Sequence, residues 1–148
     1  MHSVHVINGP NLDRLGTREP EVYGSQTLAD IEALVNALGL ADITFVQSNI
    51  EGELVDAIHA ASDAGAAIVI NPAAYTHTSV ALHDALKAVD APSVEIHLSQ
   101  PAKRESFRRD SLVAQAVDGT VSGFGAHSYI LGVQAAVNLL DARQSRQT

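Results

Sequence analysis

The sequence predicts an α/β protein in which a five-stranded parallel sheet lies between two layers of helices. Short β-rich runs alternate with segments of helical periodicity along the whole chain, and five such units can be counted. Strands that are joined through helices run parallel and are covered on both faces. Right-handed crossovers and the five-strand count favour a flavodoxin-like three-layer sandwich with strand order 2-1-3-4-5.

The strand candidates are short runs rich in β-branched residues. They span residues 4–8, 43–47, 66–71, 93–98 and 119–123. In a fold of this class, ligands bind beyond the carboxyl ends of the strands. The residues that follow the first, third and fourth runs are therefore the first place to look for a site.

Apolar residues repeat at helical spacing in four segments between and after these runs. The first segment, residues 28–38, follows Thr27, which can cap a helix, and precedes Gly39, which can end one. The other segments are marked by Leu54, Val55, Ile58 and Ala61, by Leu82, Leu86 and Val89, and by residues 130–140.

A chain of 148 residues is long enough for one domain that buries roughly 70% of the surface of its unfolded state. We find no internal repeat and no interior linker, so residues 1–148 are expected to form a single catalytic domain whose end frays from about residue 142. The chain has no cysteine, which excludes disulfides and thiolate nucleophiles. No signal-peptide pattern and no apolar run of about 18 residues is present, so we expect a soluble cytoplasmic protein without membrane association.

The formal net charge of −8 argues against a nucleic-acid partner, since such partners are bound largely through clustered Lys and Arg. The basic residues nevertheless gather in two places. Lys103, Arg104, Arg108 and Arg109 lie in one short window, and Arg14 and Arg18 lie near the N-terminus. Two small basic groups on an acidic protein suggest a small anionic ligand, although solvated surface charges remain an alternative.

The stretch NGPNLDRLGTREPEVYG, residues 8–24, is too long for an ordinary connection from strand to helix. Such connections usually take two to six residues, and longer ones are usually functional or disordered. This one contains Tyr23 together with two arginines, Arg14 and Arg18, and two asparagines. We expect a mobile lid over about residues 12–25 that brings Arg18 and Tyr23 onto a substrate.

Polar residues follow three of the predicted strands and should converge at one edge of the sheet. These residues are Asn8, Asn11, Asn71, His77, His97 and Ser99. Each has a simpler explanation on its own: Asn is a common turn residue, a single His is more often structural, and Ser99 could cap a short helix. Their convergence favours a functional site.

Several other kinds of site fit the sequence poorly. GFGAHS lacks the third Gly of a dinucleotide fingerprint, and no G-x-S-x-G motif is present for a serine hydrolase. Phospho-receiver chemistry needs acidic residues where this chain has Asn8 and Asn71. Glu95 and His97 could bind a metal only if His5 or His77 completed the set, so we expect neither a metal nor a cofactor.

The remaining groups are amides, imidazoles, guanidiniums and a phenol, which can orient a polyhydroxylated anion and transfer protons. A phenol titrates near 10, and lowering the pKa of Tyr23 to about 7 would require roughly 4 kcal/mol of differential stabilisation. Flanking guanidiniums in a water-poor site are the available source of that stabilisation.

Seven segments, in chain order and covering nearly the whole sequence, resemble the type II 3-dehydroquinate dehydratase family. They are NGPNL, REPEVYG, QSNIEGELVDAIH, INPAAYTHTSVALHDAL, EIHLS, RESFRR and GFG. The resemblance implies a flavodoxin-like hydro-lyase that dehydrates 3-dehydroquinate to 3-dehydroshikimate by anti elimination through an enol or enolate. It also implies a reaction without metal or cofactor, in the shikimate pathway or in quinate breakdown.

The resemblance assigns a role to each matching residue. Tyr23 would be the base, with Arg18 and Arg104 keeping it ionised, and Asn11 would hold the water that stabilises the enolate. His97 would be the general acid, with Glu95 orienting its ring and Asn71 beside the departing hydroxyl. The other ring hydroxyls would bind His77 and Arg108, and the carboxylate would bind Leu98 and Ser99. Asp84 would come from a neighbouring subunit of a homododecamer, a tetramer of trimers.

Four positions depart from the family pattern: Asp13, His83, Gln100 and Ser128. None removes a proposed catalytic group, although Asp13 and Gln100 bear on substrate affinity and the lid. A binding module that kept the pocket without turnover, or an interaction domain whose strand-end residues only form turns, are the competing hypotheses. The presence of both Tyr23 and His97 favours the enzyme.

Overall fold

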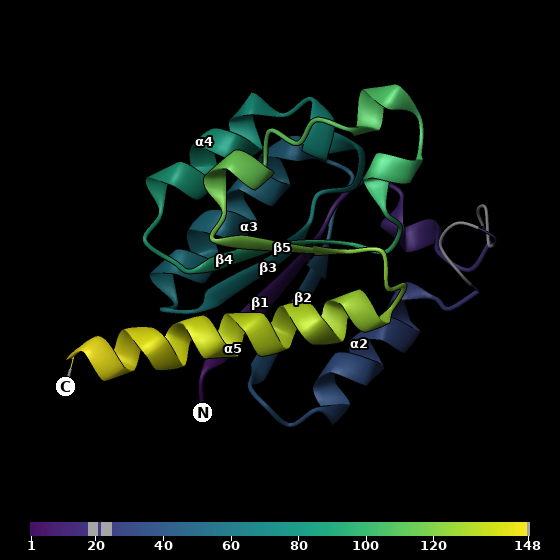
Figure 1. Ribbon diagram of the computed structural model, residues 1–148. Helices are drawn as coiled ribbons and strands as arrows, with labels where there is room; N and C mark the ends of the chain where they lie inside the picture. The colour runs from purple at the N-terminus through teal and green to yellow at the C-terminus, as the bar shows by residue number, and fades with distance from the viewer. Residues whose placement is uncertain (18–20, 22–24, 148) are drawn as a thin grey trace.

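The protein, described here by a computed structural model for residues 1–17, 21 and 25–147, contains one parallel sheet among those residues. Its strands are β1 (Ser3–Asn8), β2 (Asp42–Gln47), β3 (Ala67–Asn71), β4 (Ser93–His97) and β5 (Gly119–Ser122). The strand order is β2-β1-β3-β4-β5, which confirms the predicted order (Figure 1). The observed strands differ from the predicted runs by one residue at most at each end.

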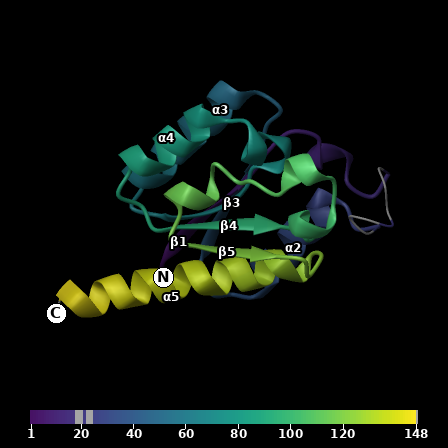
Figure 2. The same cartoon turned by 45° about the horizontal axis from the view of Figure 1, so that its top comes forward.

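Helices cover both faces of the sheet, as the fold class requires. The elements α2 (Leu28–Ala37) and α5 (His127–Gln147) lie on one face, and α3 (Glu51–Asp63) and α4 (Val80–Ala88) lie on the other (Figures 1 and 2). Short 3-10 helices span Leu12–Arg14, Ala73–His77, Pro101–Lys103, Ser106–Arg108 and Ala114–Ala116.

The two ends of α2 match the signals in the sequence. The Thr27 hydroxyl accepts a hydrogen bond from the Asp30 backbone N–H at 3.1 Å, and the Asp30 carboxylate accepts one from the Thr27 N–H at 3.0 Å. This reciprocal pair satisfies two N–H groups that a helix end leaves without partners. Gly39 follows the helix at φ +62°, a conformation that favours glycine.

The alternation of side chains along each strand divides the core into two parts. In β3, Ala67 and Val69 pack with α2 and α5, whereas Ile68 and Ile70 pack with α3 and α4. Successive side chains of a strand point to opposite faces, so neighbouring residues of one strand serve different cores. The same alternation decides which polar side chains reach the site from each face.

Helix α5 is longer than its apolar spacing indicated. It begins at His127 and continues to Gln147, although the predicted helix covered only residues 130–140. Figure 1 shows its last turns extending past the sheet, where few apolar residues are needed. Arg143 still contacts the body of the protein, because its Nη1 donates to the Asp90 carbonyl at 2.8 Å. The predicted fraying beyond residue 142 stays a prediction.

The loop after β1 is anchored to the core at its start. Leu12 and Leu15 are buried with the α2 and α5 side chains. These two residues fall within the expected lid of residues 12–25, which stays a prediction. Arg18 and Tyr23, the two functional groups assigned to the lid, lie outside the described residues.

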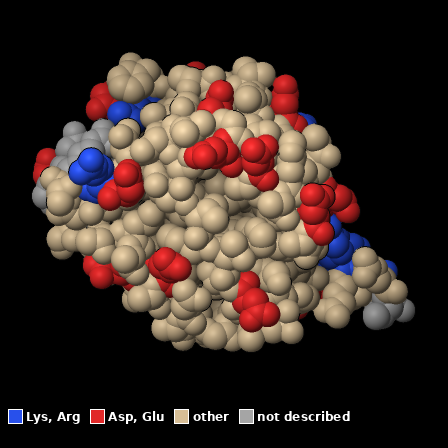
Figure 3. Space-filling view, turned by 180° about the vertical axis from the view of Figure 1, so that it is seen from behind, with Lys and Arg blue, Asp and Glu red and all other residues tan. Residues whose placement is uncertain are grey.

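The surface carries the acidic balance of the sequence. Figure 3 shows Asp and Glu side chains spread over the face seen from behind, with Lys and Arg at its margins. Among the described helices, none combines the length and the apolar character needed to cross a bilayer.

Candidate active site

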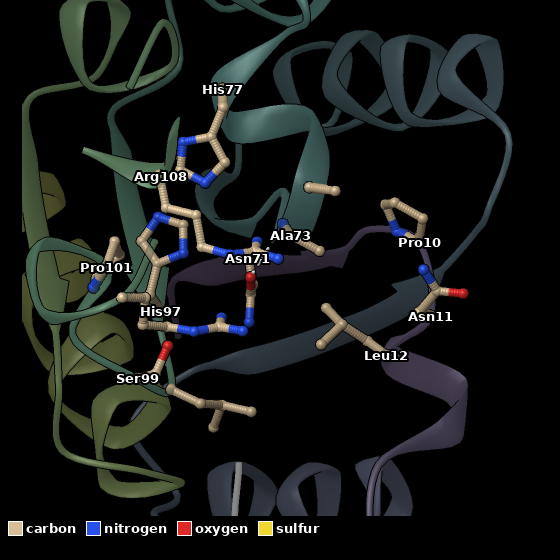
Figure 4. Close-up of a pocket in the computed structure, with 13 residues that line it drawn as sticks. Pro10, Asn11, Leu12, Asn71, Ala73, His77, His97, Ser99, Pro101 and Arg108 are labelled. Atoms are coloured by element: carbon tan, nitrogen blue, oxygen red, sulfur yellow. Dashed lines mark hydrogen bonds between the residues drawn. The ribbon is translucent and has the colours of Figure 1, made fainter. Parts of the chain in front are cut away.

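A solvent-open pocket with an empty volume of about 600 Å³ lies beyond the carboxyl ends of β1, β3 and β4. Figure 4 shows His77, His97 and Ser99 on one side, Pro10, Asn11 and Leu12 on the other, and Asn71 between them. Eight of the predicted site residues line this pocket. They are Asn11, Asn71, His77, His97, Leu98, Ser99, Arg104 and Arg108.

The two central side chains of the pocket come from opposite faces of the sheet. Asn71 follows Ala67 and Val69 on the face covered by α2 and α5, whereas His97 lies on the face of β4 opposite to Val94 and Ile96. Both are the last residues of their strands. They can meet only beyond the C-terminal ends of the strands, where no described helix covers either face of the sheet.

His97 is held by a chain of two polar contacts. Its Nε2 lies 2.5 Å from Oε2 of Glu95, and the Ser111 hydroxyl lies 3.0 Å and 3.1 Å from the two Glu95 oxygens. Glu95 is 2% exposed, so its charge depends on these partners in place of water. The predicted role of Glu95 in orienting the imidazole is compatible with this geometry.

These contacts define which ring nitrogen of His97 is available to a ligand. A carboxylate accepts hydrogen bonds, so the proton on Nε2 is donated to Glu95. Nδ1 is left for the pocket that the residue lines. A protonated imidazole held in this way can donate from Nδ1 to a leaving oxygen, which is the task of a general acid.

Asn71 is fixed from the other face. Its Nδ2 donates to the Tyr129 hydroxyl at 3.0 Å, and its Oδ1 accepts from the Ala73 N–H at 3.2 Å. Tyr129 in turn donates to Oδ1 of Asn8 at 2.6 Å. Burial raises the pKa of the Tyr129 phenol, so the group stays neutral and works as both donor and acceptor.

Asn11 combines a turn role with a place in the pocket. Its φ of +70° lies in the left-handed region, which Asn tolerates better than most residues. Its backbone N–H donates to Asn49 Oδ1 at 2.9 Å, and Gln47 donates to the same oxygen at 3.1 Å. Asn11 is thus a turn residue that also lines the pocket, and its predicted role toward the enolate stays a prediction.

The basic side of the pocket contains Arg104 and Arg108, next to Ser99 and Leu98. The Arg108 guanidinium donates to the carboxylate of Glu105 and holds the pKa of that carboxyl below its ordinary value. Arg108 also lies over the Phe107 ring, with its central carbon 4.9 Å from the ring centre. The Nε donor of Arg108 is therefore used by Glu105 within the chain.

His77 contacts the pocket from the 3-10 helix after β3. Its Nδ1 lies 2.7 Å from the Asp110 carbonyl, which only accepts, so Nδ1 carries the proton. Nε2 is then the nitrogen that a ligand can reach. The alternative interpretation of Ser99 as a helix cap is wrong, because Gln100 and Glu105 occupy the N-cap positions of the two 3-10 helices that follow and neither helix has a side-chain cap.

Asp84 lies elsewhere in this chain. It is exposed on α4 and is not among the described residues that line the pocket. Its predicted contribution to the site of a neighbouring subunit stays a prediction. Among the described residues, no group of three or more His, Cys, Asp or Glu side chains is spaced to hold a metal ion.

Three of the departures from the family pattern have internal contacts. His83 Nδ1 lies 2.7 Å from the Leu112 carbonyl, Gln100 Oε1 accepts from the Ser122 hydroxyl at 2.7 Å, and the Ser128 hydroxyl accepts from the Phe124 N–H at 3.0 Å. Each contact joins the residue to a segment near the pocket. These residues thus support the loops around the site.

The sequence did not predict that Ser111 and Tyr129 support the site by contacting Glu95 and Asn71. Tyr129 lies in an apolar helical segment and Ser111 directly follows the basic window. A hydroxyl in either context has many uses, and only the folded arrangement brings it to Glu95 or Asn71. The sequence contains no spacing signal that would have identified them.

The fold and the pocket define a class of protein, a flavodoxin-like α/β enzyme with a polar pocket beyond the carboxyl ends of its strands. The model of the family described as "Dehydroquinase class II" matches residues 2–137. The chain belongs to the class II dehydroquinase family.

Individual relatives agree with this assignment. A 3-dehydroquinate dehydratase of Phenylobacterium zucineum is 58% identical over 140 residues, covering 92% of this chain and 96% of that protein. One of Sinorhizobium medicae is 54% identical over 143 residues, covering 94% and 96%. The crystal structure of a type II dehydroquinase from Butyrivibrio crossotus matches with a TM-score of 0.89 and 36% identity, covering 91% of this chain and 97% of that one.

Proposed function

We propose that this protein is a hydro-lyase that reversibly dehydrates 3-dehydroquinate to 3-dehydroshikimate through an enolate intermediate. Relatives that are more than half identical carry the name 3-dehydroquinate dehydratase. Dehydration of a hydroxyketone needs a base at the carbon beside the ketone and an acid at the departing hydroxyl. The general biological context is the shikimate pathway.

The observation that most strongly supports this function is the buried His97–Glu95 pair opening into a pocket that also contains Asn71, Ser99 and Arg108. The imidazole provides an acid, the amide contacts the oxygen that leaves, and the polar and basic side holds an anion. A hydroxylated ring with one carboxylate matches this combination of groups.

The acid half of the reaction is assigned to His97. Protonated at both nitrogens, its ring donates from Nδ1 to the C1 hydroxyl while Nε2 remains bonded to Glu95. The C1–O bond breaks and the hydroxyl leaves as water. Asn71 binds the same oxygen, and the Ser111 hydroxyl keeps the Glu95 carboxylate in place.

The base half is assigned to the lid. Tyr23, ionised next to Arg18, removes the proton beside the ketone; the electron pair of that C–H bond forms the C=C bond of an enolate while the carbonyl π pair moves onto the ketone oxygen. A water held by Asn11 stabilises the enolate, and Arg104 assists Tyr23. Asn11 and Arg104 both line the described pocket, which supports their roles beside a bound substrate.

The remaining groups position the substrate. The backbone N–H groups at Leu98 and Ser99, with the Ser99 hydroxyl, receive the carboxylate. His77 and Arg108 bind ring hydroxyls. Asp84 reaches the site of a neighbouring subunit in a homododecamer of cytoplasmic location. The reaction needs no metal or cofactor.

The test is a pair of measurements on purified protein with 3-dehydroquinate. Absorbance of the conjugated enone product should rise on mixing, and solvent deuterium should enter the carbon beside the ketone. Tyr23→Phe should abolish both signals, because no base remains. His97→Ala should reduce product formation much more than deuterium uptake, because the acid acts in the later step.

His59→Ala is the matched control, since His59 is exposed on α3 away from the pocket. It should retain the wild-type rate in both assays. Deuterium uptake in Tyr23→Phe equal to that of the wild type would show that the base is misassigned. Absence of enone formation by the wild type would reject the function itself.

A further inference from the structure

A continuous line of hydrogen bonds links the backbone of β2 to the pocket through three buried side chains. Asn8 Nδ2 donates to the Val46 carbonyl at 2.9 Å, and Asn8 Oδ1 accepts from the Tyr129 hydroxyl at 2.6 Å. Tyr129 accepts from Asn71 Nδ2 at 3.0 Å, and Asn71 Oδ1 accepts from the Ala73 N–H at 3.2 Å.

The direction of every bond in this line is determined by its two backbone ends. The Val46 carbonyl can only accept, so the Asn8 amide must present its NH₂ there and its oxygen to Tyr129. The Ala73 N–H can only donate, so the Asn71 amide must present its oxygen there and its NH₂ to Tyr129. The tyrosine hydroxyl fits between them only as donor to Asn8 and acceptor from Asn71.

The side chains of this line are shielded from water. Asn8 and Tyr129 are 0% exposed and Asn71 is 3% exposed. The Asn8 and Asn71 side chains are neighbours because the two residues are register partners at the ends of β1 and β3. Tyr129 reaches them from the first turns of α5, and its ring also lies 6.4 Å from that of Phe45.

We propose that Tyr129 is a positioning residue that locks the Asn71 amide in one orientation, with its NH₂ group toward the pocket. One N–H of Asn71 is used by the tyrosine, and the second is then available to an oxygen of the ligand. Asn71 is thereby a donor at this point and not an acceptor. The site accordingly selects a ligand that presents a hydroxyl oxygen as acceptor there.

The consequence for the reaction rests on the proposed function. A departing hydroxyl gains negative charge as its bond to carbon breaks, so a donor from Asn71 binds it more strongly in the transition state than in the ground state. An amide with the opposite orientation would present its own oxygen to the same atom and oppose that charge. The lock therefore affects kcat more than KM.

Removal of the hydroxyl alone separates positioning from packing. Tyr129→Phe keeps the ring in the core but leaves Asn71 Nδ2 and Asn8 Oδ1 without their partner. The Asn71 amide is then held by the Ala73 N–H alone, and its orientation is less firmly fixed. Since one of the two hydrogen bonds that fix the orientation is lost, kcat should fall about five- to tenfold, with a smaller change in KM.

The test is a double-mutant cycle of Tyr129→Phe with Asn71→Ala. If Tyr129 acts through Asn71, the double variant should turn over no more slowly than Asn71→Ala alone. The proposal would be overturned if the double variant lost kcat by the product of the two single losses. It would also be overturned if kcat were unchanged in Tyr129→Phe. Val133→Ala is the matched control: it creates a cavity in the same helix and core, and should lower stability while leaving kcat near the wild-type value.

A second readout does not depend on activity. In a ¹⁵N spectrum, the Asn71 side-chain NH₂ signals should shift or broaden in Tyr129→Phe and stay in place in Val133→Ala. Such a change in a protein that fails to form the enone would reject the proposed function and retain the lock. Unchanged NH₂ signals in Tyr129→Phe would reject the lock, whatever the activity.

Discussion

His97 Nε2 and Glu95 Oε2 lie 2.5 Å apart, and both residues belong to the same strand, β4. Residues two positions apart in a strand share a face, and here that face opens at the edge of the sheet. Ser111 contacts both carboxylate oxygens from the loop that precedes β5. A charged group and its hydroxyl donor thus determine the orientation of the proposed acid.

Glu95→Gln should lower kcat by about 10- to 100-fold, because a hydrogen bond to a charged group is replaced by a neutral one. Ser111→Ala should lower it less, by about three- to tenfold, since the carboxylate keeps its contact with His97. Initial rates at saturating 3-dehydroquinate measure both effects. Ser111→Thr keeps a hydroxyl and should retain most of the wild-type rate. Ser106→Ala, at an exposed position, should leave the rate unchanged. A larger loss in Ser111→Ala than in Glu95→Gln would contradict this order.

Gly9→Ala should destabilise the protein. A Cβ at this position would lie 2.5 Å from the Pro72 carbonyl oxygen and 2.8 Å from its carbon, which are backbone atoms that can move only with the chain. Overpacking of this kind costs about 1–3 kcal/mol of unfolding free energy. The midpoint of urea unfolding measures the loss. Gly9 N–H also donates to the Asn71 carbonyl at 2.8 Å, so kcat should fall as well.

Gly52→Ala is the control for that substitution. Gly52 lies in the first turn of α3, and an added Cβ there has no neighbour within 4 Å among the described residues. Alanine should therefore stabilise the helix by about 0.5–1 kcal/mol. Equal unfolding midpoints for the two variants would show that the close approach of Gly9 to Pro72 has no energetic weight.

His5 should make the stability of the protein fall in mild acid. Burial lowers the pKa of this imidazole on β1 from its ordinary value of 6.5. In the unfolded chain the group takes up its proton near pH 6.5, and in the folded protein only at lower pH, so the unfolded state gains protons first as the pH falls. The contribution of His5 is thus fully present above pH 6.5 and is lost as the pH falls toward the folded-state pKa.

Urea unfolding at pH 8 and at pH 5 measures this dependence. The difference between the two midpoints should be smaller in His5→Gln than in the wild type, because the variant has no group to protonate on β1. His59→Gln, a change at an exposed position of α3, should keep the wild-type difference. A His5→Gln protein with an undiminished difference would assign the acid sensitivity to other groups.

Subunit mixing should test the place of Asp84. Asp84→Ala and Tyr23→Phe are both expected to be inactive when pure, because each lacks one group of the proposed shared site. After subunit exchange, some sites should combine both native residues, and part of the activity should return. Native mass spectrometry can verify the exchange. Exchange without recovered activity would place Asp84 outside the neighbouring site.

The strands and their order could be predicted because local composition and the rules of parallel connection agree in this chain. The same rules placed Asn71 and His97 at one edge, since a residue that ends a strand must lie there. Tyr129 and Ser111 could not be predicted in the same way. Their hydroxyls contact groups that are 58 and 16 positions away along the chain, and only the packing of α5 and of the loop before β5 creates those contacts.

The extent of α5 escaped prediction for a different reason. Its last turns extend past the sheet, so apolar periodicity stops near Leu140 while the helix continues to Gln147. Asn11 shows a further limit, because a residue favoured in the left-handed region is also a residue suited to binding water. Sequence patterns alone do not separate those two uses.

Asn71 and His97 come from opposite faces of the sheet, so both reach the pocket only when β3 and β4 pair in the correct register. The catalytic rate should therefore depend strongly on that register. If β4 slipped by one position against β3, Ile96 would exchange faces with Glu95 and His97, and the acid would point toward α5. Such a slip would keep the extended backbone and the parallel pairing of the strand, although it would turn Val94 and Ile96 away from the core that they share with α5. Turnover per molecule would therefore detect a misregistered population in refolded samples that spectroscopic measures of secondary structure would count as native.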